Sequence, residues 1–188
     1  MLTLHYKTES IYFINHNNNK TKRIMKKLFI TLCVALLSLG AQAQEKGTVA
    51  IGAHVGPTIT KMEIGEFKET STRFGVGAFG QYNFTDHWRL NVSADYYPKK
   101  DGFSVFVLGG DIHYLINITD EFKLYPLAGY AFSFLSGDGD SDHDSGIQLG
   151  FGGQFNLSEK TFFNAEYKWQ PGFFGDGHVI MIGYGLRF

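Results

Sequence analysis

Cysteine, proline and long apolar runs are all scarce in this sequence, which has one cysteine and four prolines among 188 residues. Cys33 lies in an apolar segment near the start, so the rest of the chain has no disulfide framework and no thiol chemistry. No stretch after Ala43 approaches the roughly 20 apolar residues of a transmembrane helix. A membrane location would therefore require a closed barrel, because only helices and closed barrels satisfy every backbone polar group in lipid.

The first quarter of the chain has the pattern of an export signal rather than of a folded domain. Met25-Lys26-Lys27 precedes an apolar core over residues 28–40, and Ala41-Gln42-Ala43 matches an A-x-A cleavage site. This order is typical of a secretory signal peptide. We therefore expect a signal peptide over 25–43, a non-native extension over 1–24, and one domain over 44–188.

The domain also lacks an excess of basic residues. Six of the 17 Lys and Arg residues and one of the 18 Asp and Glu residues lie before position 44, which leaves residues 44–188 with a formal charge of −6. An acidic chain is a poor partner for nucleic acid, so no nucleic-acid partner is expected.

Within residues 44–188, apolar and polar residues alternate in many segments. Between Trp88 and Tyr96 every second residue is apolar, and the residues between them are Arg, Asn, Ser and Asp. A period of two with an aromatic residue at each end is typical of a strand with one face in lipid. The same pattern predicts strands over residues 48–56, 73–84, 88–97, 103–117, 122–134, 147–157, 161–169 and 179–188. Pro126 falls inside one of them, and we expect a bulge there because proline cannot donate to a ladder.

The segments between the predicted strands differ in length from one end of the sheet to the other. Short turns are expected at 85–87, 118–121 and 158–160. Longer polar loops are expected at 58–72, 98–102, 136–145 and 170–177. Alternating short turns and long loops are characteristic of antiparallel membrane barrels.

The last predicted strand keeps its apolar face to the end of the chain, with Ile180, Ile182, Tyr184, Leu186 and Phe188 at a spacing of two. This segment resembles the closing strand of bacterial outer-membrane β-barrels, and the whole domain resembles a small OmpA/OmpX-type barrel. The resemblance implies an all-β, eight-stranded antiparallel transmembrane barrel, monomeric, in contact with lipid and lipopolysaccharide in the outer membrane of a Gram-negative bacterium. It also implies that the barrel assembly machinery recognises this end, with Tyr184 and Phe188 as the assembly signal.

The same alternation would fit a soluble sandwich or lipocalin whose apolar face points inward. The export signal, the aromatic residues near strand ends and the terminal Phe favour lipid outside and a polar lumen. Eight strands leave a lumen just wide enough for side chains, so charges facing it must pair. The predicted lumen charge network contains residues of both signs: Arg89, Asp95, Asp111, His113, Lys123, Glu166 and Lys168.

Two motifs suggest ligands. Gly75, Gly77 and Gly80 match the G-x-G-x-x-G spacing of dinucleotide sites, but they lie inside a strand, where a crowded lumen explains them better. The acidic segment carries carboxylates at every second position, at Asp138, Asp140, Asp142 and Asp144. Such a row could bind Ca²⁺ weakly or bridge to lipopolysaccharide phosphates, although the EF-hand register fails and a solvated acidic loop is favoured.

These features favour a structural or surface-interaction protein, with loops 58–72 and 136–145 presented outside for adhesion or ligand contact. A narrow channel for small solutes is the alternative, disfavoured because the lumen is filled. Lipid A modification is a third class, but no serine and carboxylate accompany His54, His113, His143 or His178 as a triad requires. We therefore expect no enzyme activity, no catalytic residues and no cofactor.

Overall fold

The computed structural model describes residues 46–64, 67–100, 102–137, 141–171 and 176–188, and all of their regular structure is β. Among these residues no helix is long and apolar enough to cross a membrane. The strands are β1 (Val49–Ile64), β2 (Phe67–Asn83), β3 (Trp88–Lys100), β4 (Phe103–Tyr114), β5 (Ile116–Asn117), β6 (Phe122–Ser136), β7 (Ser141–Asn156), β8 (Thr161–Gln170) and β9 (Asp176–Arg187).

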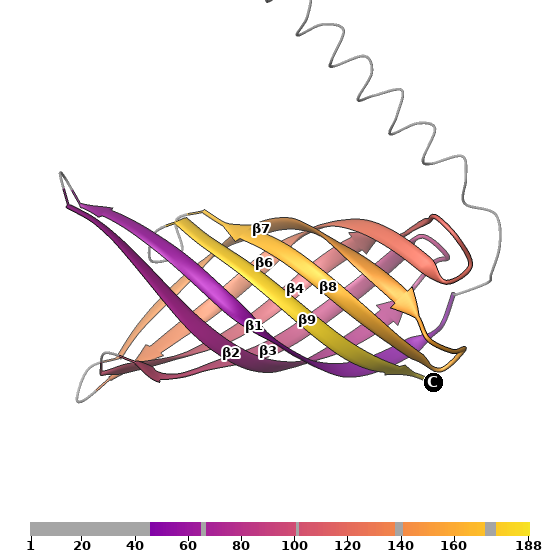
Figure 1. Ribbon diagram of the computed structural model, residues 1–188, viewed down its shortest axis with the longest axis horizontal. Helices are drawn as coiled ribbons and strands as arrows, with labels where there is room; N and C mark the ends of the chain where they lie inside the picture. Colours follow the sequence, from indigo (N-terminus) through magenta and orange to yellow (C-terminus); the bar gives the residue numbers. More distant parts are fainter. Residues whose placement is uncertain (1–45, 65–66, 101, 138–140, 172–175) are drawn as a thin grey trace, which may run out of the picture. The chain divides into compact units, whose positions relative to one another are not determined.

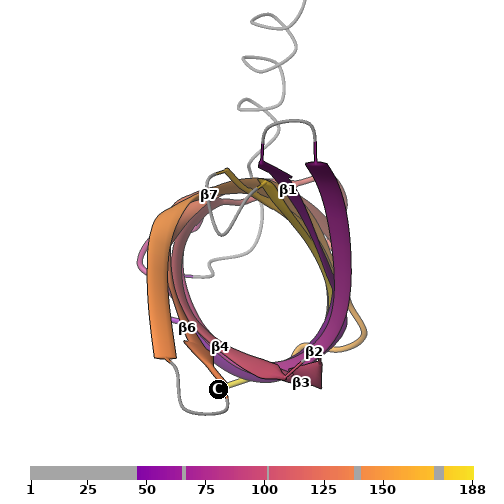
Figure 2. The same ribbon diagram turned by 90° about the vertical axis from the view of Figure 1, so that its left-hand side faces the viewer.

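The strands of residues 46–188 form one closed antiparallel barrel (Figures 1 and 2). Apart from β4 and β5, which do not pair with each other, each strand pairs with its neighbours in sequence, β1 pairs with β9, and β4 pairs with β6. The short β5 continues β4, since both pair with β6 in one register. The barrel therefore has eight strands in its described part, and the predicted fold class is confirmed.

The prediction of a bulge at Pro126 is wrong. The β6–β7 register runs unbroken from Phe122↔Phe155 to Ser136↔Ser141 and includes Pro126 itself. On its other side β6 keeps the same register with β4 and with β5, and only the pairing opposite Pro126 is interrupted. Because Pro126 has no N–H, the ladder lacks a hydrogen bond there. This gap separates β4 from β5 but leaves the register of the pairing unchanged.

Two of the predicted loops are largely strand. The β1–β2 ladder continues without interruption to Ile64↔Phe67, so most of 58–72 is a regular hairpin. The β6–β7 ladder likewise continues to Ser136↔Ser141, which places 141–145 in β7. Residues 98–100 belong to β3 rather than to a loop. We refer to this end of the barrel as the loop end, and to the end with the short turns and the chain terminus as the turn end (Figure 1).

The two faces of the strands differ in the way a membrane barrel requires. The outer face is exposed and apolar, with Phe74 71% exposed and Ile182 and Phe151 each 62% exposed. The inner face is buried and mostly polar, and charged residues such as Arg89, at 2% exposed, lie on it. The interior of this barrel is thus mainly polar, unlike the apolar core of a soluble protein.

Candidate functional site

The centre of the lumen is filled by a layer of aromatic and polar side chains from β3, β4, β6 and β7. Arg89 donates from Nη1 to Gln154 Oε1 at 2.6 Å and from Nε to His113 Nδ1 at 3.2 Å. The guanidinium carbon lies 4.6 Å from the ring centroid of Tyr125, and the rings of Tyr125 and His113 stack at 4.7 Å. These contacts reach from β3 to β7, so the layer crosses the lumen.

A second group of charges lies beside this layer. Lys168 Nζ donates to Asp111 Oδ2 at 2.9 Å and lies 3.5 Å from Glu166 Oε2. Gln148 donates to the other oxygen of Asp111 at 2.6 Å, and Tyr125 donates its hydroxyl to Glu166 at 2.9 Å. One buried lysine therefore contacts two buried carboxylates, and both acids accept further bonds.

A third polar group joins β1 to β3. Asp95 contacts His54 Nε2 with one carboxylate oxygen and accepts from Ser93 Oγ with the other, at 3.2 Å. The order of these groups differs from that of a hydrolytic triad, in which histidine lies between the nucleophile and the acid. Here the carboxylate is central, so the histidine does not contact the serine as a base would.

Large side chains also fill the lumen toward the turn end. Phe79 and Phe162 are buried with ring centroids 6.3 Å apart, and Arg187 lies 5.0 Å from the Phe162 ring centroid. Inward glycines make room for them. A Cβ at Gly185 would overlap the Phe162 ring, and one at Gly52 would overlap the Phe79 ring.

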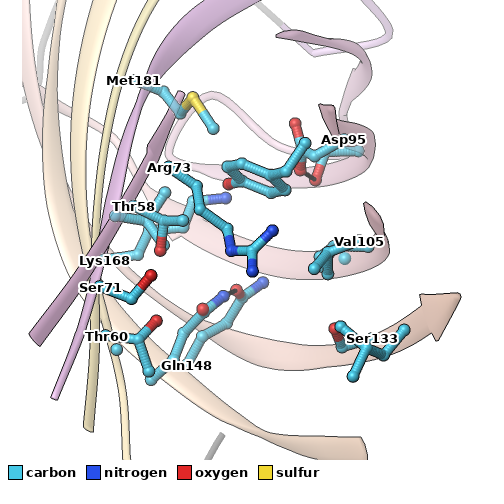
Figure 3. A pocket seen from close by; sticks show the side chains of 18 of the residues that line it. Thr58, Thr60, Ser71, Arg73, Asp95, Val105, Ser133, Gln148, Lys168 and Met181 are labelled. Carbon is cyan, nitrogen blue, oxygen red and sulfur yellow. Dashed lines mark hydrogen bonds between the residues drawn. The ribbon is translucent and has the colours of Figure 1, made fainter. Parts of the chain in front are cut away.

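Two cavities remain, one at each end of the lumen. The loop-end cavity has a volume of about 260 Å³, and its lining includes His54, Arg73 and Lys168 (Figure 3). The turn-end cavity has a volume of about 840 Å³, and its lining includes Lys123 and Phe188. The two linings share no residue, because the central layer lies between them.

All residues of the predicted lumen charge network lie on the inner face, and each is at most 7% exposed. Arg89 and His113 are in the central layer, and Asp111, Glu166 and Lys168 form the second group. Asp95 pairs with His54, a residue outside the predicted set, and Lys123 lies apart at the turn end.

Several neutral residues of the interior were not predicted as site residues. Gln148, Gln154 and Tyr125 complete the bonds of the charged groups, and Phe79 and Phe162 fill the space beside them. Their inward positions follow from the alternation, but their partners do not, because contacts across the lumen depend on the closed register.

The acidic segment is only partly described. Asp138 and Asp140 lie outside the described residues. Asp142 and Asp144 begin β7, and each accepts a bond from the backbone N–H of the next residue, at 2.8 and 2.7 Å. Within the described ranges no group of three His, Cys, Asp or Glu residues is placed to hold a metal ion. The weak Ca²⁺ site stays a prediction.

The predicted assembly signal lies on the outer face of β9. Tyr184 packs edge to face against Phe163 with ring centroids 5.2 Å apart. Phe188 is 75% exposed, and its backbone N–H donates to the carbonyl of Val49 at 2.9 Å, where β9 meets β1. Recognition of this end by the assembly machinery stays a prediction.

A closed barrel with an apolar outer face and a paired, polar lumen is a transmembrane β-barrel. The chain belongs to the outer membrane protein beta-barrel domain family, whose model matches residues 29–188. It is thus an outer-membrane β-barrel protein, as the sequence resemblance predicted. A comparison with curated proteins gave no match.

Solved structures show the same fold. The N-terminal β-barrel domain of Pseudomonas aeruginosa OprF is 18% identical, with a TM-score of 0.60 over 78% of this chain and 100% of that one. Neisserial surface protein A is 14% identical, with a TM-score of 0.60 over 78% and 100%. Ail, the attachment invasion locus protein of Yersinia pestis, is 20% identical, with a TM-score of 0.51 over 76% and 99%. At these identities the likeness concerns the fold alone.

Proposed function

We propose that this protein is a surface-interaction barrel, in which the lumen is a structural filling and stiff hairpins at the loop end contact a partner outside the cell. The observation that carries the proposal is the length of strand pairing at this end. The β1–β2 ladder continues to Ile64↔Phe67, whereas β2 pairs with β3 only as far as Val76↔Tyr96. The hairpin therefore extends beyond the wall on that side as a preformed arm.

The second hairpin extends beyond the wall on the β7 side only. The β6–β7 ladder continues to Ser136↔Ser141 and β7 pairs with β8 only as far as Leu149↔Trp169, whereas β6 stays paired with β4 to Ser104↔Ser136. Paired strands are already ordered, so contact with a partner costs less conformational entropy than it would for flexible loops. Their outer edges also carry backbone groups that can pair with an added strand.

The orientation of the barrel supports the same proposal. In bacterial outer-membrane barrels the short turns face the periplasm and the longer connections face outward. By this rule, the turns near Thr85, Thr119 and Ser158 would lie in the periplasm, and both arms would lie outside the cell. Polar residues dominate the arms, which suits a surface in contact with water.

The two alternatives have less support. A channel requires a continuous path, and the central layer separates the two cavities of the lumen. An acyl-transferring or hydrolysing enzyme requires an activated nucleophile, and Ser93 bonds to Asp95 instead of to His54.

Shortening one arm tests the proposal. A variant lacking residues 61–70, with Thr60 and Ser71 joined by an Asn-Gly turn, keeps the barrel pairs of β2 with β3. Bacteria expressing this variant, the full chain or Glu159→Gln, an exposed change at the turn end, would be compared for adherence to wells coated with fibronectin or laminin. Levels of folded protein would be matched by the fast-migrating band of unboiled samples.

The full chain and Glu159→Gln should raise adherence above that of cells without the protein, and the shortened variant should not. Adherence that persists without the arm, or no adherence of the full chain at matched levels, would contradict the proposal.

A further inference from the structure

The loop-end cavity has two unlike walls. On the side of β1 and β2 its lining carries the hydroxyls of Thr58, Thr60 and Ser71 together with Arg73 (Figure 3). On the side of β4 and β6 the lining is mainly apolar, with Val105, Val107 and Leu135, and Tyr97, Val179 and Met181 add apolar surface. The lining toward the centre of the barrel is polar, with His54, Ser93, Asp95, Gln148, Lys168 and Gln170. A molecule in this space would meet polar donors on one side and an apolar surface on the other.

Arg73 is the charged group of this lining that has no ionic partner among the described residues. Asp95 is paired with His54, and Lys168 is paired with Asp111. Arg73 donates from Nη1 to the backbone carbonyl of Phe103 at 2.9 Å, and this bond holds the side chain across the interval where β2 and β3 do not pair. Figure 3 shows its guanidinium among the side chains that line the cavity. The cavity therefore carries a positioned positive charge with donors left over.

Ser133 is a buried polar residue on the apolar side of the cavity, where a water molecule rather than the apolar part of a ligand would satisfy it. It lines the same cavity and is 1% exposed, yet its buried Oγ has no hydrogen-bond partner in the part of the chain that the structure describes. Buried polar groups are nearly always bonded, and an exception calls for a bound molecule or water. Ser133 lies on β6, beside the apolar wall and away from the hydroxyls of β1 and β2.

We propose that the loop-end cavity binds a small amphipathic carboxylate. The carboxylate accepts bonds from Arg73 and the neighbouring hydroxyls, and the apolar chain lies against Val105, Val107 and Met181. A volume of about 260 Å³ is just below the range of roughly 300–1,000 Å³ for ligand pockets, which suits a small ligand with a short acyl chain. An unpaired cation favours an anion, and an apolar wall favours a chain over a sugar, whose hydroxyls would lose their bonds with water.

The cavity shares Ser71 and Arg73 with the base of the β1–β2 arm, but the variant that tests the arm lacks only residues 61–70 and keeps both of these residues. The two proposals can therefore be tested independently, and adherence does not report on binding in the cavity.

The test uses the full chain, assembled in the outer membrane, purified and placed in phospholipid nanodiscs. Methionine methyl groups would be labelled with carbon-13, because Met181 lines the cavity. The probe is octanoate, and octylamine, which has the same chain and the opposite charge, is the matched ligand control. The Met181 resonance would be assigned with Met181→Leu.

Three variants make the test specific. Arg73→Gln removes the cation, and Lys61→Gln removes an exposed cation at the same end that does not line the cavity. Val105→Phe keeps Arg73 and fills the space for the chain. Each variant is used only if unboiled samples give the fast-migrating band of a folded barrel.

Octanoate should shift the Met181 resonance saturably, and octylamine should not shift it. A bond to a charged group accounts for tenfold or more in affinity, so Arg73→Gln should raise the Kd about tenfold or more and Lys61→Gln should not. Val105→Phe should abolish the shift. Equal shifts with octylamine, equal binding by Arg73→Gln and the unchanged chain, or no saturable shift would each overturn the proposal.

Discussion

Lys168 is the residue on which the charge balance of the lumen depends. It contacts Asp111 and Glu166, and all three side chains are almost completely buried. Removing one member of a buried ion pair leaves an uncompensated charge, which costs more than the pair itself contributes. We expect Lys168→Met to lower the free energy of unfolding by about 3–5 kcal/mol. Urea unfolding in phospholipid vesicles, followed by tryptophan fluorescence, measures this change.

Two further variants separate loss of charge balance from loss of packing. Lys61→Met removes an exposed lysine, and it should change stability by less than about 0.5 kcal/mol. Lys168→Met combined with Asp111→Asn and Glu166→Gln removes all three charges, and it should recover much of the loss. A triple variant as unstable as Lys168→Met alone would contradict the argument.

The glycines of β2 allow a matched comparison within one strand. A Cβ at Gly77 would overlap Asp95 Oδ1 and His54 Nε2 and come within 2.8 Å of the carbonyl of Ala94, whereas one at Gly80 meets only Val92 Cγ2 at 3.5 Å. Gly77→Ala should therefore destabilise the barrel by about 1–3 kcal/mol, as overpacking does. Gly80→Ala should be neutral or stabilise it by up to ~1 kcal/mol, because alanine suits a strand better than glycine. Equal unfolding midpoints in urea would show that Gly77 is not needed for space.

At this scale the sequence predicts positions but not partners. Alternation places Asp111 and Lys168 on the inner face, since their neighbours in sequence are apolar or small. It does not show that these two meet, because they are 57 residues apart and their contact depends on how far each strand is staggered in the closed barrel. The stacking of His113 on Tyr125 is a contact of the same kind.

At the scale of strands, alternation predicted the membrane segments well and missed the arms. A period of two reports the contrast between lipid on one side of a strand and the lumen on the other. Beyond the apolar belt both sides of a hairpin meet water, so the contrast disappears although the pairing continues. Residues 58–64 and 141–145 therefore looked like loops in the sequence and are strands in the barrel.

The β2 part of the arm is paired on one side only, and this predicts the pattern of its amide hydrogen exchange. Residues 67–75 pair with β1 but not with β3. Because successive amides of a strand point to opposite sides, every second amide should be protected by β1, and those between should exchange ~tenfold faster or more. Hydrogen exchange followed by NMR in nanodiscs measures this directly. Uniformly fast exchange over 67–75 would show that the segment is a loop in solution.

At the scale of the whole molecule, the central layer decides whether the barrel can conduct. Arg89 connects His113 to Gln154 across the lumen, and Tyr125 packs against both Arg89 and His113. Phe79 and Phe162 add a second obstruction toward the turn end. Every polar group that closes the path also holds the wall together, so the interior acts as the core of this protein.

We therefore expect the full chain to give no discrete conductance steps in planar lipid bilayers. Arg89→Ala combined with Tyr125→Ala removes the two largest side chains of the central layer and should create steps, provided that unboiled samples still give the fast-migrating band. Phe163→Ala, which shortens an exposed aromatic residue of the outer face, should stay silent and controls for general damage to the barrel. Reproducible steps from the full chain would mean that the layer opens in a bilayer, and the channel would then replace surface contact as the favoured function. Silence of the full chain together with steps from the double variant would show that the side chains of the layer, rather than the diameter of an eight-stranded wall, close the path.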